Sequence, residues 1–213
     1  MKLSRRHLIG ASVVAAVGLG SPRLFATPYR PKLPTTPTPP VPSTPPGIVE
    51  QALAALDTHS ARILDRDMIG VADYSLNSGE DRFHLVDIVG GRIVRSYLVS
   101  HGRGSDRSNS GYVQKFSNRP GSYASSQGSF VTGETYYGKH GKSRRLIGLE
   151  EQNSLALDRA IVIHGADYVD RSMAKQQGRV GRSLGCFAFE RCEIGEVLEI
   201  LGPGRLLYSG KLA

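Results

Sequence analysis

The sequence predicts a mainly β domain with a few short helices. Short apolar runs of strand length alternate with glycine-rich turns, and only two segments have the spacing of an amphipathic helix. The chain contains 25 glycines, a residue type that tight turns between strands favour. Strands that outnumber helices in this way are typical of a β sheet with one or two helices packed on it.

The first segment of the chain has the pattern of an export signal. Arg5 and Arg6 precede an apolar stretch at residues 8–19, which is shorter than the about 20 residues that a membrane-spanning helix needs. The string SRRHLIG is close to the twin-arginine export signature. We therefore expect residues 1–26 to be a twin-arginine-type signal peptide that is cleaved near Ala26. The mature protein would then lie in the periplasm or cell envelope without stable membrane insertion; an uncleaved N-terminal anchor is the alternative.

A proline-rich linker is expected at residues 27–47. Nine prolines lie between residues 28 and 46, and almost no side chain there is suited to a core. Such a composition favours extended polyproline geometry and is typical of a spacer. The remainder, residues 48–213, has the length of one domain and not of two.

The mature chain is expected to be mildly basic. The formal net charge of +8 falls to +4 when residues 1–26 and their four cations are removed. The remaining lysines and arginines are scattered, and no basic run is interleaved with aromatic residues as in proteins that bind single-stranded nucleic acid. The composition therefore gives no support to a nucleic-acid partner.

Helical spacing marks both ends of the predicted domain. Apolar residues recur near the period of a helix from Ile48 to Ile63, which predicts an opening helix. The segment CEIGEVLEILG, residues 192–202, has the pattern of a short amphipathic helix that ends before Pro203.

Runs rich in β-branched and aromatic residues fill the region between these helices. Residues 81–100 contain two such runs around Gly90-Gly91 and predict a hairpin. Further strands are predicted at 128–134, 158–165 and 204–210. The long segments 101–127 and 138–150 are rich in glycine and polar residues, so we expect loops there, and loops of this length usually bind a ligand or are disordered.

Cys186 is one of two cysteines, and its chemistry is the main question that the sequence raises. The strand predicted upstream ends in His164-Gly165, and a glycine-rich segment leads from there to Cys186. A histidine beside a thiol activates it as a nucleophile, because an imidazolium stabilises the thiolate. Gly185 allows a sharp turn and leaves room for a substrate carbonyl at nearby N–H groups, which would form an oxyanion hole. A buried thiol and a disulfide with Cys192 remain open as alternatives.

These residues resemble the active-site signature of a known family. His164-Gly165, followed by the S-x-G-C pattern at 183–186, is similar to the signature of the L,D-transpeptidases, the YkuD-type catalytic domain, and in particular to their exported branch of murein L,D-transpeptidase catalytic domain proteins. Leu184 stands where the commonest form of the signature has a second histidine. The resemblance covers roughly residues 70–210 and includes the strings SHGRGS (100–105), KFSNRPGSYASSQGSFVTGETYYGKHG (115–141), DRAIVIHGADYV (158–169) and GRVGRSLGC (178–186).

The resemblance implies a YkuD-like β-sandwich domain and a cysteine acyltransferase without a cofactor. By similarity Cys186 is the nucleophile, which attacks a peptidoglycan stem peptide after its L-centre and forms a thioester, and His164 activates it. The main-chain oxygen of Gly165 orients the imidazole, and Ser183 and Gly185 match the serine and glycine ahead of the nucleophile. Transfer of the acyl group to an amine of a neighbouring stem would form a crosslink. Carbapenem-type β-lactams would be inhibitors.

Four further residues are candidates for substrate binding: Arg182, Tyr137, Lys139 and His101. Arg182 adjoins the motif and is suited to hold a stem-peptide carboxylate through a bidentate pair. Tyr137 and Lys139 lie in a segment suited to a polar peptide-glycan ligand, and His101 is a candidate for a residue behind the site. No Cys-x2-Cys or His-x3-His pair occurs, so no metal site is expected.

Two alternative functions stay open from the sequence. The same cysteine and histidine would act as an L,D-carboxypeptidase or crosslink hydrolase if water accepts the acyl group. A non-catalytic envelope-binding domain would result if Cys186 and Cys192 form a disulfide.

Overall fold

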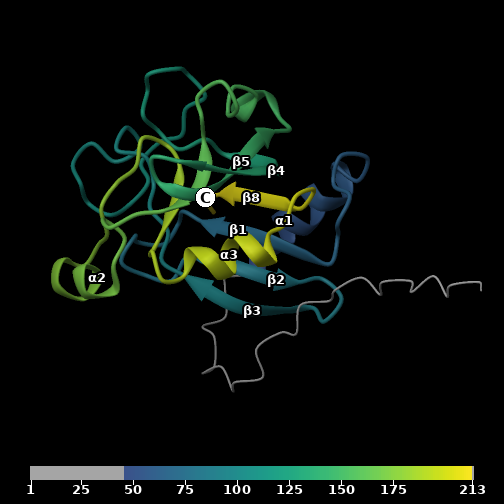
Figure 1. Ribbon diagram of the computed structural model, residues 1–213, viewed down its shortest axis with the longest axis horizontal. Helices are drawn as coiled ribbons and strands as arrows, with labels where there is room; N and C mark the ends of the chain where they lie inside the picture. Colours follow the sequence, from purple (N-terminus) through teal and green to yellow (C-terminus); the bar gives the residue numbers. More distant parts are fainter. Residues whose placement is uncertain (1–45, 213) are drawn as a thin grey trace, which may run out of the picture. The chain divides into compact units, whose positions relative to one another are not determined.

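The computed structural model describes residues 46–212 (Figure 1). Within this range the chain is mainly β, as the sequence predicts, with eight strands and three α-helices. The helices are α1 (Pro46–Thr58), α2 (Arg171–Gln177) and α3 (Ile194–Ile200), and a short 3-10 helix, η1, covers Glu151–Asn153. The strands are β1 (Met68–Asp73), β2 (Phe83–Asp87), β3 (Arg92–Tyr97), β4 (Gly128–Gly138), β5 (Gly141–Gly148), β6 (Val162–Gly165), β7 (Phe187–Phe189) and β8 (Leu206–Gly210).

The strands of the described residues form one mixed sheet in the order β3-β2-β1-β8-β4-β5-β6-β7. This sheet curls until its two ends face each other. The ring of Phe83 on β2 packs edge-on against Phe189 on β7, with 4.8 Å between the ring centroids, and Tyr97 on β3 packs against the same ring at 6.2 Å. The layered packing of the expected β-sandwich is therefore made by opposite ends of a single sheet.

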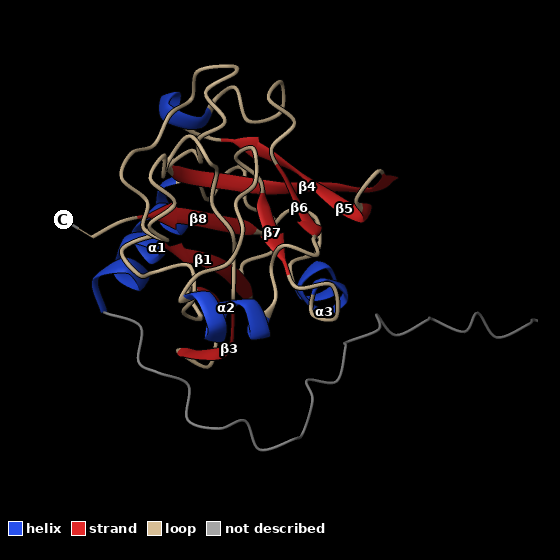
Figure 2. Cartoon of the chain, turned by 90° about the vertical axis from the view of Figure 1, so that its left-hand side faces the viewer, coloured by secondary structure: helices blue, strands red, loops and turns tan. Residues whose placement is uncertain are grey.

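Two apolar clusters fix the sheet from its two faces. The curled inner face encloses side chains from β1 to β8, and α3 adds Val197 and Leu198 to this cluster. Helix α1 lies against β1 and β8 on the other face, where Ile48, Ala52 and Leu56 are almost completely buried (Figure 2). Because both faces are packed, the strand ends that carry the candidate site are held in place.

The structure confirms most of the elements that have a clear apolar pattern. The opening helix is α1, the predicted hairpin is β2–β3 and the closing helix is α3. Predicted strands at 128–134 and 204–210 correspond to β4 and β8. The segment 101–127 runs without a helix or an extended strand, as expected.

The prediction of a loop at 138–150 is wrong, because β5 pairs with β4 there. The buried positions of β5 include Arg144, so this strand lacks the alternation of apolar and polar residues by which strands are recognised. The strand predicted at 158–165 begins only at Val162, since Ala160 lies in a turn with φ of +53°. Strands β1 and β7 and helix α2 were not predicted from the sequence. Strand β7 has only 3 residues, and most of α2 is not buried, so neither has a clear apolar pattern.

The predicted signal peptide, residues 1–26, lies outside the described residues, as does almost all of the linker predicted at 27–47. Helix α1 begins at Pro46, within the last two residues of that predicted linker. None of the helices in the described part of the chain has the length and apolar character that a membrane crossing requires.

Candidate active site

The predicted catalytic pair lies on two neighbouring strands near one end of the sheet. Strands β6 and β7 run parallel, and their register pairs Ile163 with Phe187 and His164 with Ala188. Cys186 is the residue directly before β7. Since side chains alternate along a strand, continuing the alternation of β7 places Cys186 on the face of His164, while Ile163 and Phe187 enter the inner core. The sheet thus places two residues that are well separated in the sequence on the same face of neighbouring strands.

Ser183 and Gly185 hold the turn that presents Cys186. The hydroxyl of Ser183 donates to the main-chain oxygen of Cys186 at 2.7 Å and accepts from the N–H of Gly185 at 3.1 Å. Gly185 has a φ of +118°, and a Cβ there would lie 2.7 Å from the carbonyl oxygen of Ala124, so only glycine fits. The main chain of Ser183 is bonded through both its N–H and its carbonyl to the loop that begins at His101. The turn is therefore fixed from both sides.

His164 is oriented by the main-chain oxygen of Gly165, as the resemblance implies. Its Nδ1 lies 2.9 Å from that oxygen, and donation of the Nδ1 proton leaves Nε2 as the acceptor. His164 is 1% exposed, and the ring of His140 stacks on it with 4.2 Å between centroids. Burial lowers the pKa of His164 to about 4, although the Gly165 carbonyl acts in the opposite direction. The imidazole is therefore neutral at pH 7, which is the form that accepts a proton.

The Cys186 thiol is also neutral in this setting. The thiol donates a hydrogen bond to the carbonyl oxygen of Ala160, with 3.5 Å between sulfur and oxygen. Burial raises the pKa of Cys186, and the N–H of Val162 and the cations Arg159 and Lys139 offset part of this increase. The sequence predicts a thiolate beside an imidazolium. The pKa shifts favour a thiol beside a neutral imidazole, because burial penalises the charged form of each group.

The disulfide alternative does not match the structure. Both Cys186 and Cys192 are free, and Cys192 is exposed. The whole of β7 lies between them, and its 3 extended residues, at about 3.3 Å each, carry the two sulfurs apart. A disulfide needs Cα atoms within about 7 Å, so the structure speaks against this alternative.

The tip of the β4–β5 hairpin brings Lys139, one of the predicted substrate-binding residues, to the site. Lys139 and His140 form the two-residue turn, and Gly138 pairs with Gly141 across it. Since His140 stacks on His164, the tip lies against the β6 histidine, and Lys139 is among the cations that lower its pKa. Tyr137 is 81% exposed at the end of β4, which leaves its ring available to a ligand.

The two other predicted substrate-binding residues, Arg182 and His101, differ in their surroundings. Arg182 is half-buried ahead of the Cys186 turn and donates to the main-chain oxygen of Asp106. His101 is 0% exposed, and its two ring nitrogens are bonded to Arg82 at 2.7 Å and to Asp106 at 3.3 Å. A completely buried ring has no surface for a substrate, so a substrate-binding role for His101 is wrong. Its bonds to Arg82 and Asp106 place it behind the site, which was the other expectation for this residue.

Two residues of the site had no predicted role. His140 covers His164, and the only signal for it was its place in the string TYYGKHG. Arg159 lies behind the Cys186 turn, where it donates to the main-chain oxygens of Ala124 and Ser117. No pattern in the sequence marks Arg159, because its role depends on contacts with a distant loop.

Comparison with known proteins gives a direct assignment. A family model described as the L,D-transpeptidase catalytic domain matches residues 42–209. The chain belongs to this family. No curated protein matches the sequence.

Solved L,D-transpeptidases resemble this L,D-transpeptidase catalytic domain at low sequence identity. The enzyme from Mycobacterium smegmatis is 13% identical, with a TM-score of 0.42, and the match covers 68% of this chain and 58% of that one. L,D-transpeptidase 3 from Mycobacterium tuberculosis in complex with a faropenem-derived adduct is 13% identical, with a TM-score of 0.41, and the match covers 67% of this chain and 60% of that one. The L,D-transpeptidase from Xylanimonas cellulosilytica is 16% identical, with a TM-score of 0.40, and the match covers 74% of this chain and 68% of that one. The chain thus spans about three-fifths of the length of the two mycobacterial structures.

The candidate site of this L,D-transpeptidase domain contains one thiol, Cys186, and one oriented imidazole, His164. Within residues 46–212 no group of three or more His, Cys, Asp and Glu side chains is placed to hold a metal ion. A neutral imidazole with a free Nε2 is a general base, and a thiol that loses its proton during attack is a nucleophile. The arrangement is therefore suited to acyl transfer.

Proposed function

We propose that this protein is a cell-wall L,D-transpeptidase that uses Cys186 as nucleophile and His164 as general base. The observation that supports this proposal is the neutral imidazole of His164, which the Gly165 carbonyl orients through Nδ1. His164 lies on β6, and β6 pairs with β7, the strand that directly follows Cys186. Membership of the L,D-transpeptidase family supports the assignment.

The first step forms the acyl-enzyme. The thiol of Cys186 turns from the Ala160 oxygen, and Nε2 of His164 takes its proton as the sulfur attacks the amide carbon after the L-centre of a stem peptide. Catalytic hydrogen bonds of this kind often tighten only when substrate is bound. The carbon–sulfur bond forms, the carbon–nitrogen bond breaks, and His164 returns the proton to the amine of the departing D-residue. A thioester on Cys186 results.

The second step releases the acyl group. An amine of a neighbouring stem attacks the thioester carbon and gives a proton to His164, which passes it to the sulfur as the carbon–sulfur bond breaks. The product is a crosslink between two stems, and the free enzyme is restored. Water in place of the amine would give a shortened stem.

We assign the oxyanion hole for both steps to the main-chain N–H of Cys186. The N–H of Gly185 donates to the Ser183 hydroxyl at 3.1 Å and so serves the turn rather than the substrate. The glycine still contributes, because the absence of a Cβ lets the substrate carbonyl approach the main chain.

The proposed place of action is the periplasm or cell envelope, where a twin-arginine-type signal at residues 1–26 would deliver the protein. That route carries folded proteins, so Cys186 would arrive reduced. β-Lactams of the carbapenem class are proposed inhibitors, since solved L,D-transpeptidases include one in complex with imipenem.

Muropeptide analysis tests the proposed function. Purified protein is incubated with a disaccharide-tetrapeptide, and the products are separated and weighed. We expect crosslinked dimers with wild type and with Cys192→Ala, and no product with Cys186→Ala. Product from Cys186→Ala would overturn the mechanism, and shortened stems without dimers would assign a hydrolase instead.

A further inference from the structure

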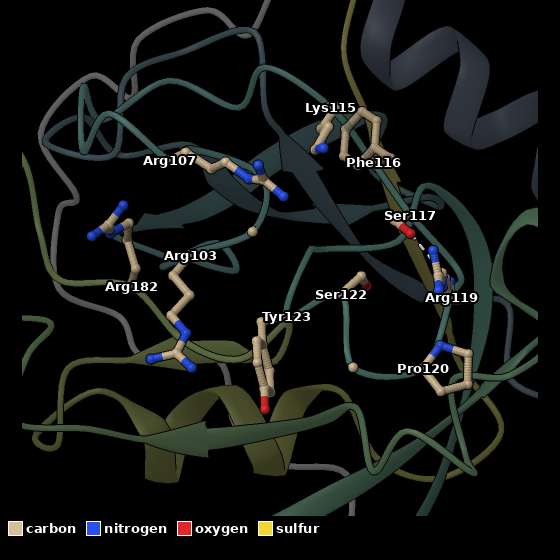
Figure 3. A pocket seen from close by; sticks show the side chains of 12 residues that line it. Arg103, Arg107, Lys115, Phe116, Ser117, Arg119, Pro120, Ser122, Tyr123 and Arg182 are labelled. Carbon is tan, nitrogen blue, oxygen red and sulfur yellow. Dashed lines mark hydrogen bonds between the residues drawn. The ribbon is translucent and has the colours of Figure 1, made fainter.

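A hollow of about 700 Å³ is lined by the long loop before β4 and by Arg182, which directly precedes Ser183 of the Cys186 turn (Figure 3). Five cationic side chains of the described residues line it, and no aspartate or glutamate does. They are Arg103, Arg107, Lys115, Arg119 and Arg182. In Figure 3, Arg103, Arg107 and Arg182 gather on one side of the hollow and Arg119 lies opposite, so the positive charges surround the space.

These five charges have no ion-pair partner among the described residues, whereas several other arginines of the domain do. Arg171, for example, is bonded to Asp81 and to Glu193, each at 2.9 Å. The acid nearest in sequence, Asp106, turns its carboxylate inward and accepts from the N–H of Gly111 at 2.9 Å. Several like charges in one hollow repel one another, and a bound anion relieves that repulsion.

The walls of the hollow are firmly held. Arg159 donates from behind to the main-chain oxygens of Ser117, at 2.7 Å, and of Ala124. Gly104 packs so closely that a Cβ there would lie 1.9 Å from the carbonyl oxygen of Ser122. A site that is already in place loses little conformational entropy when a ligand binds.

The hollow and the Cys186 turn share a wall. The N–H of Arg103, a lining residue, donates to the carbonyl oxygen of Ser183 at 2.9 Å. Arg159 reaches the hydroxyl of the lining residue Ser122 at 3.5 Å, and the same guanidinium lies 3.2 Å from the position of a Cβ on Gly185. The hollow therefore lies directly beside the turn that presents Cys186.

We propose that the hollow is an anion subsite that binds free carboxylates of the peptidoglycan stem peptide, away from the bond that reacts. This inference rests on the proposed function, because it places the ligand on the same molecule as the acyl donor. Four guanidinium groups offer the paired N–H donors that match a carboxylate. A phosphate group has the same hydrogen-bonding pattern, so the test separates the two.

The test compares steady-state kinetics for a stem peptide with free carboxylates and for the same peptide with its non-reacting carboxylates amidated. With wild type we expect amidation to raise KM about tenfold or more, because charge-assisted hydrogen bonds are lost. The variant R103Q/R119Q should raise KM for the free peptide to the same level, with kcat and KM for the amidated peptide unchanged. The control R62Q/K175Q removes two exposed cations outside the hollow and should behave like wild type.

The outcomes distinguish failure of the subsite from failure of the proposed function. If carbapenem acylates Cys186 and the peptide reacts, but KM does not respond to amidation or to R103Q/R119Q, the subsite is overturned and the function stands. If inorganic phosphate inhibits wild type where glutarate at equal concentration does not, the carboxylate assignment is overturned in favour of phosphate. If neither carbapenem nor peptide modifies Cys186, the proposed function itself fails.

Discussion

Replacement of Gly185 by alanine is expected to damage the protein at the turn that presents Cys186. The φ of +118° lies outside the range that alanine adopts, which costs about 1–3 kcal/mol. The new Cβ would also lie 2.7 Å from the Ala124 oxygen and 2.8 Å from Cδ1 of Ile161, and overpacking of a buried site costs about 1–3 kcal/mol more. We therefore expect the free energy of unfolding to fall by about 4 kcal/mol and Tm by about 10 °C.

The assay is thermal unfolding, followed by the rate of acyl-adduct formation on the folded variant at a lower temperature. Gly178→Ala is the matched control, since Gly178 also has a positive φ, +68°, but nothing lies within 4 Å of a Cβ there. This control should lose only about 1 kcal/mol and keep its acylation rate. Equal losses in the two variants, or normal acylation by Gly185→Ala, would refute the tight fit behind Cys186.

Three further predictions concern hydrogen bonds, stacking and acid. Ser183→Ala removes two hydrogen bonds of the Cys186 turn and should cost about 1–3 kcal/mol in chemical denaturation and slow acylation; an unchanged rate would contradict this. His140→Ala exposes the β6 histidine, so NMR titration should show the pKa of that ring rise from about 4 towards 6.5, and an unmoved value would exclude shielding by His140. Burial lowers the pKa of His84 to about 4 and of His101 to about 3. As the pH falls, these histidines therefore bind protons in the unfolded chain before they do so in the folded one. Tm should fall as the pH drops from 6.5 to 5, and a Tm that does not change with pH would contradict this prediction.

The residues that could be predicted from the sequence are those with a local signal. The apolar spacing of α1 and the Gly90-Gly91 turn of the hairpin depend on neighbouring residues, and both predictions are confirmed. The S-x-G-C motif identified Ser183 and Gly185 as residues of the site, and the hydrogen bonds of the Ser183 hydroxyl join residues within a few positions of Cys186. Patterns of this kind survive in a single sequence because the contacts that cause them are short-range.

Contacts between distant segments could not be predicted in this way. Strand β5 buries Arg144, whose guanidinium donates to the carbonyl oxygens of Gly133 and Leu198, and no apolar pattern marks such a strand. The complete burial of His101 depends on its partner Arg82, which lies on a different strand connection, so no local pattern excludes a substrate-binding role. The neutral state of the thiol–imidazole pair likewise follows from burial, which only the packed sheet determines.

The most direct test of the account is the mass of the intact protein after incubation with imipenem at pH 7, with peptide mapping of the modified residue. We predict one adduct on Cys186 in wild type and in Cys192→Ala, and none in Cys186→Ala. An unmodified wild type, or an adduct that maps to Cys192, would contradict the assignment of Cys186 as the nucleophile.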